Sequence, residues 1–220
     1  MVHLRHMQKL NALECIRAGW DIFKKRPFML IGVFVVAFIV SGISSALLDP
    51  GQNAPVTFAT TLMSIASGIV GVFVEMGLIT FALRAYDSIE SAGIKDLWNA
   101  MPFFYYFAAQ IVVGLSVLLG LVLLIVPGIM VALALMFTSY LVIDKHRGPI
   151  EALKESSRIT KGHRWQLLVL VLTIIGLNIL GLIALIVGLL VTIPVSMLAV
   201  VHAYRKLEHG ASEVAPVSAM

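Results

Sequence analysis

The chain has 220 residues, of which 60% are hydrophobic and only 13% charged, and its formal net charge is +4. A soluble domain carries about 45–50% apolar and about 25% charged residues. One globular core cannot hide so much apolar surface beneath so few charges, which excludes an ordinary soluble protein. The composition predicts an integral membrane protein, and the single cysteine, Cys15, excludes an internal disulfide.

The first long apolar run follows a basic N-terminal segment. Charged residues extend to Arg26, which is too long a basic region for a cleaved signal peptide, so we expect a retained first span. Residues 28–48 supply the roughly 20 residues that a transmembrane helix needs. The sequence DPG at 49–51 is typical of a turn. Residues 56–83 predict a second span, which Glu75 interrupts.

Two longer apolar runs occupy the rest of the chain. Residues 102–143 and 166–203 correspond to roughly 63 and 57 Å of helix, too long for one span each and suitable for two. Each run predicts a helical hairpin, with turns near 120–128 and 181–188, where glycine and proline occur. A re-entrant loop is the alternative. We therefore predict an all-α polytopic bundle of six transmembrane helices in three hairpins, within a transmembrane domain at 28–207.

The positive charges are distributed asymmetrically. All 16 Lys and Arg residues fall on one face of the six-span arrangement, and the opposite face holds Asp49 without any cation. The positive-inside rule then places both termini in the cytoplasm. Residues 208–220 are small and polar, which predicts a disordered cytoplasmic tail.

Two segments between spans predict interfacial helices. In the cytoplasmic segment 1–27, apolar residues recur at three- and four-residue steps, which is typical of an amphipathic helix lying in the membrane interface. Its expected apolar face consists of Leu10, Leu13, Ile16, Trp20 and Phe23. The second such helix is expected at 149–161, where Pro149 suits the first helical position.

Cations and tryptophans gather where spans begin, as is typical of anchors at lipid headgroups. The expected anchors are Trp20, Lys24, Lys25, Arg26, Trp98, Lys161, Arg164 and Trp165. The alternative is nucleic-acid binding, suggested by a pI of about 9.3. No basic and aromatic residues are arranged on a soluble face to support it. We therefore expect membrane lipids as partners and no nucleic acid.

Three polar residues lie within the predicted spans. Glu75 lies nine residues before Arg84, about 13 Å inside the membrane, where a carboxylate is costly unless it is protonated, paired or hydrated. Gln110 lies at a similar depth and can hydrogen-bond a protonated Glu75, whereas Asn178 is deeper. Three interpretations stay open: proton, ion or polar-substrate coupling, hydrogen bonds that hold helices together, and contact with lipid headgroups.

No catalytic or metal-binding constellation is recognisable. The chain has no G-x-S-x-G, no phosphate-binding glycine loop and no H-E-x-x-H, and its six histidines lack ligand spacing. The loops at 87–101 and 144–165 are too short for a soluble catalytic domain. We expect no catalytic residue, no metal and no cofactor. Pro127 and Pro194 are hinge candidates, with static bends as the alternative.

The C-terminal half resembles a known group of membrane proteins. The similarity covers residues 100–207 well, through LLIVPGIMVALALMFTSYLVID (123–144), GPIEALKESSRITKGHRWQLLVLVL (148–172) and ILGLIALIVGLLVTIPVSMLAVVHAYRKL (179–207). This pattern is similar to the membrane domain attached to some bacterial glycerophosphodiester phosphodiesterases and to related stand-alone membrane proteins of unknown function. The resemblance implies a six-helix inner-membrane protein. It brings no activity, because the chemistry of those enzymes belongs to a separate soluble domain.

The leading functional hypothesis is a non-catalytic inner-membrane accessory or scaffold module for an envelope protein or a lipid-linked process. Another membrane or envelope protein is then an expected partner, and the oligomeric state stays open. The alternative is a small transporter or channel that uses Glu75, and a polar cavity reaching that residue would favour it. A membrane-embedded enzyme acting on lipids is the third possibility, without a nucleophile to support it.

Overall fold

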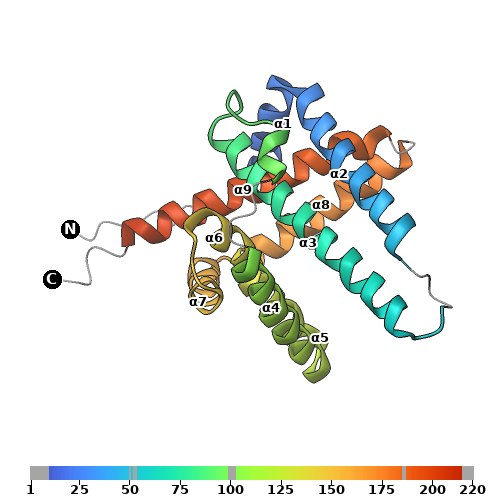
Figure 1. Cartoon of the computed structure of the whole chain (residues 1–220). Coiled ribbons are helices and arrows are strands. Elements are labelled where there is room, and N and C mark those ends of the chain that lie inside the picture. The colour runs from blue at the N-terminus through green and yellow to red at the C-terminus, as the bar shows by residue number, and fades with distance from the viewer. Residues whose placement is uncertain (1–9, 50, 52–53, 99–102, 185–186, 215–220) are drawn as a thin grey trace, which may run out of the picture.

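The computed structural model describes residues 10–49, 51, 54–98, 103–184 and 187–214. Within these ranges the chain forms nine α-helices, one 3-10 helix and no strand (Figure 1). Six helices are long and apolar enough to cross a membrane. The predicted all-α polytopic bundle is therefore confirmed.

The first hairpin follows a short amphipathic helix. Helix α1 (Ala12–Lys25) begins at Asn11, whose side chain accepts a hydrogen bond of 3.0 Å from the backbone N–H of Leu13. Pro27 then opens α2 (Pro27–Leu48), a position where a missing N–H costs nothing. Helix α3 (Phe58–Asp87) begins with a capping box made by Thr57 and Thr60.

The second hairpin consists of α4 (Phe103–Leu123) and a broken span, α5 (Ile125–Leu135) and α6 (Thr138–Lys145). Only Leu124, with extended backbone, separates α4 from α5. The two helices meet through Gly120 and Gly128, since a Cβ added at Gly120 would lie 2.9 Å from the Cα of Gly128. The turn falls within the predicted interval 120–128.

The third hairpin consists of α8 (Arg164–Ile183) and α9 (Val187–Val214) and follows α7 (Pro149–Thr160), the second predicted interfacial helix. A Cβ at Gly188 would lie 2.3 Å from the carbonyl oxygen of Gly181, so only glycine fits at this turn, which lies in the predicted interval.

Helix α9 extends beyond the predicted end of the transmembrane domain, so residues 208–214 of the expected disordered tail are helical. Two interactions extend the helix there: Glu208 pairs with Lys145 at 3.1 Å, and the ring of His209 donates to the carbonyl oxygen of Arg205. Residues 215–220 lie outside the described ranges.

The core lies at one end of the bundle. We call this the cation-bearing end, because the cations that flank the spans lie there: Arg26, Arg84, Lys145, Arg164 and Arg205. Buried side chains in the spans belong to the halves nearer this end, such as Leu30 and Val33 in α2 and Met76, Phe81 and Ala85 in α3. Toward the turns, the buried residues of the second and third hairpins are the glycines that join the two helices.

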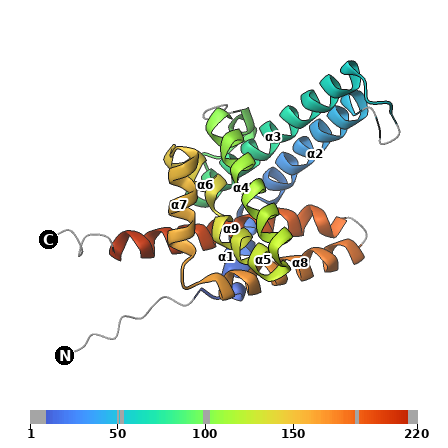
Figure 2. The same ribbon diagram turned by 90° about the horizontal axis from the view of Figure 1, so that it is seen from below.

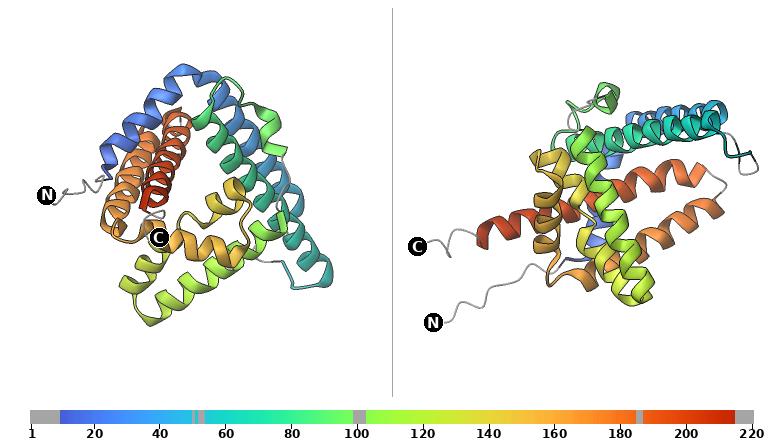
Figure 3. Two further views of the ribbon diagram at one scale, coloured as in Figure 1. Left: turned by 90° about the vertical axis from the view of Figure 1, so that its left-hand side faces the viewer. Right: turned by 60° about the horizontal axis from the view of Figure 1, so that its bottom comes forward.

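The three hairpins therefore pack together at the cation-bearing end and diverge toward their turns. Figure 2 shows the turn-side ends of helices α2 and α3 well apart from those of α8 and α9. Figure 3 shows the α4–α5 hairpin separate from both. Each turn-side half contacts its own hairpin partner and leaves apolar side chains exposed, including Phe38, Leu118 and Ile179.

Helix α1 packs against α9 through small residues. A Cβ at Gly19 would lie 2.5 Å from the carbonyl oxygen of Val195, and Cys15 is fully buried. Of the predicted apolar face, Leu10 and Phe23 are buried against the bundle, whereas Leu13 and Trp20 are 61% and 44% exposed. Small residues allow the two backbones to approach closely, and the large side chains then point outward, as suits an interfacial helix.

Two buried hydroxyl groups explain the break between α5 and α6. Ser156 of α7 accepts a hydrogen bond of 3.2 Å from the backbone N–H of Phe137 and donates one of 2.9 Å to the carbonyl oxygen of Ala134. Thr160 donates to the same carbonyl at 3.2 Å. Backbone groups released by the break are thereby satisfied inside the protein, which the membrane interior requires.

Candidate functional site

The predicted intramembrane pair of Glu75 and Gln110 is in contact. The side-chain nitrogen Nε2 of Gln110 lies 3.1 and 3.2 Å from the two carboxyl oxygens of Glu75, and 3.1 Å from the hydroxyl of Tyr106. Tyr106 is fully buried, whereas Glu75 is exposed on the surface of the bundle. This polar cluster joins α3 of the first hairpin to α4 of the second.

Asn178 belongs to a separate cluster in the third hairpin. Its Nδ2 donates to the hydroxyl of Ser196 at 3.2 Å and to the carbonyl oxygen of Ile174 at 3.0 Å. Its Oδ1 is buried without a hydrogen-bond partner among the described residues. The sequence named Asn178 as an intramembrane polar candidate deeper than Glu75 and Gln110, and the structure places it between α8 and α9.

Arg205 forms the densest polar network, at the cation-bearing end. Its guanidinium bonds both carboxyl oxygens of Asp87, at 3.1 and 2.5 Å, and both of Asp144, at 2.8 and 2.9 Å. The hydroxyl of Tyr204 donates to Asp144 at 2.9 Å. The planar, five-donor guanidinium suits such double pairing. One residue thus joins α3, α6 and α9, which come from three different hairpins.

This role of Arg205 was missed by the sequence analysis, which counted it only as a boundary cation. Asp87 ends the second span and Asp144 lies near the end of the fourth, while Arg205 lies near the end of the sixth. Because alternate spans end on the same side, that spacing was the available signal. This spacing predicts that the three helix ends meet, but it does not predict which side chains pair.

A hollow of about 560 Å³ lies beside this network, with Glu14, Tyr86 and His202 among its lining residues. Lys206 bonds both carboxyl oxygens of Glu14 at 2.8 Å, and this hydrogen bond lowers the pKa of Glu14 although partial burial opposes the shift. His202 and Tyr86 share a hydrogen bond of 2.9 Å. Since Arg205 and Lys206 already have carboxylate partners, the hollow offers no surplus charge for an anionic ligand.

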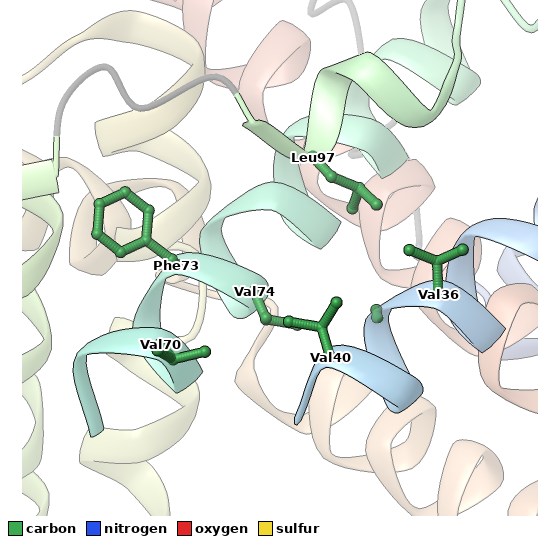
Figure 4. A pocket seen from close by; sticks show the side chains of 7 residues that line it. Val36, Val40, Val70, Phe73, Val74 and Leu97 are labelled. Atoms are coloured by element: carbon green, nitrogen blue, oxygen red, sulfur yellow. The ribbon is translucent and has the colours of Figure 1, made fainter. Parts of the chain in front are cut away.

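A second, apolar groove opens between α2 and α3 (Figure 4). Its volume is about 350 Å³, and its lining consists of Val36, Ala37 and Val40 of α2, Val70, Phe73 and Val74 of α3, and Leu97. Leu97 belongs to η1 (Ile94–Trp98), which rests directly on α3, since a Cβ at Gly77 would lie 2.4 Å from the carbonyl oxygen of Leu97. Buried Asp96 pairs with Arg84 and fixes η1 there.

The predicted anchors lie where their helices meet the cation-bearing end. Lys24 pairs with Asp21 at 2.8 Å, and Lys25, Arg26 and Lys161 are exposed. Trp165, at the start of α8 beside Arg164, is 74% exposed. The side chain of Trp98 lies outside the described part of the chain.

The two hinge candidates occupy different positions in their helices. Pro127 is the third residue of α5, where the first turn has no intrahelical hydrogen bond to lose, whereas Pro194 lies inside α9. Within the described ranges, no group of three or more histidine, cysteine or acidic side chains is placed to hold a metal ion.

The chain was compared with curated proteins, solved structures and family models. No curated protein and no solved structure is similar to this chain. A family model described as a protein of unknown function (DUF975) matches residues 27–211, which covers all three hairpins. Its description carries no activity, and the likeness to the membrane domain of phosphodiesterases stays a prediction. The chain therefore belongs to the DUF975 family of proteins of unknown function.

Proposed function

We propose that this protein is a non-catalytic module of the bacterial inner membrane, with both termini in the cytoplasm. In this role it supports an envelope protein or a lipid-linked process by binding transmembrane helices of a partner. The observation that carries the proposal is a set of glycines in the spans at which an added Cβ would meet nothing within 4 Å among the described residues.

Glycines within the helices fall into two groups. One group, which includes Gly19, Gly120 and Gly188, has backbone atoms so close that no Cβ would fit. For the other group, an added Cβ would meet nothing within 4 Å: Gly32, Gly42, Gly68, Gly71, Gly114 and Gly176 in the apolar parts of the spans, and Gly210 near the end of α9. Glycine inside a helix costs about 0.5–1 kcal/mol relative to alanine, and in membranes it serves close helix packing. The uncovered glycines therefore favour packing against helices from outside the chain.

The divergence of the hairpins supports the same role. The core and the Arg205 network hold the three hairpins at the cation-bearing end, while the turn-side halves stand apart with apolar faces uncovered. A partner helix can pack against these faces without disturbing the core. Because helices in lipid gain little from the hydrophobic effect, close packing at small residues has to supply the association.

The alternative, a transporter or channel that uses Glu75, has less support. A polar cavity reaching Glu75 was the feature expected of it, yet neither the apolar groove nor the charged hollow is lined by Glu75, Gln110 or Asn178. The carboxyl of Glu75 is instead hydrogen-bonded to a neighbouring helix. This arrangement favours a role in holding helices together.

Photo-crosslinking in intact membranes tests the proposed module. A photoreactive amino acid replaces Phe38, which is 80% exposed and lies one helical turn from Gly42. We expect a discrete protein adduct in mass spectrometry, which disappears when Gly42→Leu fills the packing surface. The same photoreactive residue at Val56, outside the helices, is the matched control and should give no such adduct. Lipid adducts alone at both positions would contradict the proposal.

A further inference from the structure

We propose that the apolar groove between α2 and α3 binds an acyl chain of an anionic phospholipid, whose phosphate meets the cations near the start of α2. The site goes beyond the proposed scaffold role, because it names a ligand and does not depend on any protein partner. It requires only that the six spans lie in a bilayer.

The depth of the groove selects an acyl chain as its occupant. Val36 and Val40 lie ten and fourteen residues beyond Arg26 along α2, and Val74 and Val70 lie the same distances before Arg84 along α3. At about 1.5 Å per residue, the groove is about 15–21 Å from the cations. A bilayer is about 40–45 Å thick with its headgroups, so this depth is among the acyl chains.

The shape of the groove also suits a chain. Toward the headgroups, the seam between α2 and α3 is closed, because Leu30 and Val33 are buried in one cluster with Ala92 and Leu97. The cover ends at Leu97, and the groove lies beyond it, between Val36 and Val40 of α2 and Val70 and Val74 of α3 (Figure 4). Its volume of about 350 Å³ lies within the range of about 300–1,000 Å³ that is typical of ligand pockets. All of its lining side chains are apolar, which excludes a polar ligand.

The charges above the groove select the headgroup. Lys25 and Arg26, at the junction of α1 and α2, are exposed, and Lys95 is exposed on the same 3-10 helix that supplies Leu97. The nearby carboxyl of Asp96 is buried and already engaged by Arg84 and by the backbone N–H of Gly93. Over residues 21–26 and 88–98 together, Asp21 is exposed but pairs with Lys24, which leaves Glu90 as the one other exposed carboxylate against the exposed cations Lys25, Arg26 and Lys95. This excess of positive charge favours a phospholipid headgroup with a net negative charge over a zwitterionic headgroup.

Photolabelling of the purified protein in vesicles tests this site. The probe is phosphatidylglycerol with a diazirine midway along one acyl chain, diluted into unlabelled phosphatidylcholine. A phosphatidylcholine probe with the same chain is the comparison. We expect labels on residues 36–40 and 70–74, several-fold more abundant with the phosphatidylglycerol probe. Equal labelling by the two probes, or labels spread evenly over the spans, would overturn the proposal.

Two variants separate the contribution of the groove from that of the cations. Val40→Trp fills the groove and should abolish labelling there, whereas Val122→Trp, at a 78% exposed position of α4, should leave it unchanged. Neutralising Lys25 and Lys95 to Gln should reduce the phosphatidylglycerol preference about fivefold for each cation, which corresponds to about 1 kcal/mol. A preference that survives both neutralisations would contradict the headgroup assignment, and gel filtration confirms that each variant is folded. The result of this lipid-labelling experiment does not depend on whether crosslinking at Phe38 finds a protein partner.

Discussion

A single carboxyl inside a membrane span is tolerated here because an amide from another hairpin bonds it. Gln110 contacts both oxygens of Glu75 and also the hydroxyl of Tyr106. The sequence predicted this pair, because both residues interrupt apolar runs at the same depth. It did not predict Tyr106, since a tyrosine near the start of a span is equally typical of an interfacial anchor. Nor did it predict the partners of Arg205, which depend on how three hairpins dock.

Substitutions at Glu75 and Gln110 distinguish a structural role from proton or ion coupling. If the pair holds helices together, Glu75→Gln should keep the thermal stability of the purified protein, because an amide still bonds Gln110. Gln110→Leu should reduce the free energy of unfolding by about 1 kcal/mol, since the carboxyl then loses its partner. The measurement is thermal unfolding in detergent at neutral pH. A large loss of stability in Glu75→Gln would show that ionisation of the carboxyl matters.

Helix α7 has a structural role that its amphipathic pattern did not predict. Its boundaries were predicted from Pro149 and from the glycine that follows, and they are confirmed. The side chains of Ser156 and Thr160 had been noted only as parts of a family resemblance. The structure gives them a physical reason, because they bond the backbone groups of Ala134 and Phe137 where the fourth span breaks. The break itself could not be predicted, since the run from Ile125 to Lys145 has no proline or glycine near residue 136.

Removing one of these hydroxyls should therefore be costly, whereas its neighbour is dispensable. Ser156→Ala leaves the backbone N–H of Phe137 buried without its partner, and we expect a loss of about 1–3 kcal/mol in the free energy of unfolding. Ser157→Ala is the matched control, because Ser157 is only half-buried and its side chain makes no bond to the break; we expect a change within about 0.5 kcal/mol. Thermal unfolding of both variants in the same detergent measures the difference. Equal losses would contradict this role of Ser156.

At the scale of the whole molecule, hydropathy predicted the six spans and the turn intervals but not the divergence of the hairpins. Apolar side chains are equally suitable for facing lipid and for facing another helix, so composition does not tell the two surfaces apart. The glycines carried part of the missing information. With the prolines they predicted where the turns of the second and third hairpins lie, and the structure shows that the two helices approach closely there at Gly120 and Gly188. Other glycines in the spans have no neighbouring helix where a Cβ would lie, and only the packing of the helices distinguishes them from Gly120 and Gly188.

The proposed orientation can be checked with cysteine labelling of intact cells. Val56→Cys lies at the turn of the first hairpin, and Lys154→Cys lies on α7. We expect an impermeant maleimide to label Val56→Cys from outside, and Lys154→Cys only after the cells are permeabilised. Native Cys15 should stay unlabelled near neutral pH, because it is fully buried and burial raises the pKa of its thiol to about 11. External labelling at Lys154→Cys would reverse the orientation.

The position of Arg205 near the C-terminal end of the last span has a consequence for biosynthesis. The ribosome synthesises Asp87 and Asp144 before it reaches Arg205. The first two hairpins therefore enter the bilayer while these carboxylates lack their shared partner. Helix α1, the first of these helices to be made, also lacks its main contacts until α9 is made, because Glu14 pairs with Lys206 and Gly19 packs against Val195. Docking of the bundle is thus postponed until the last span has been made. Nascent chains that stop before residue 205 should remain as separate hairpins, open to membrane quality-control proteases.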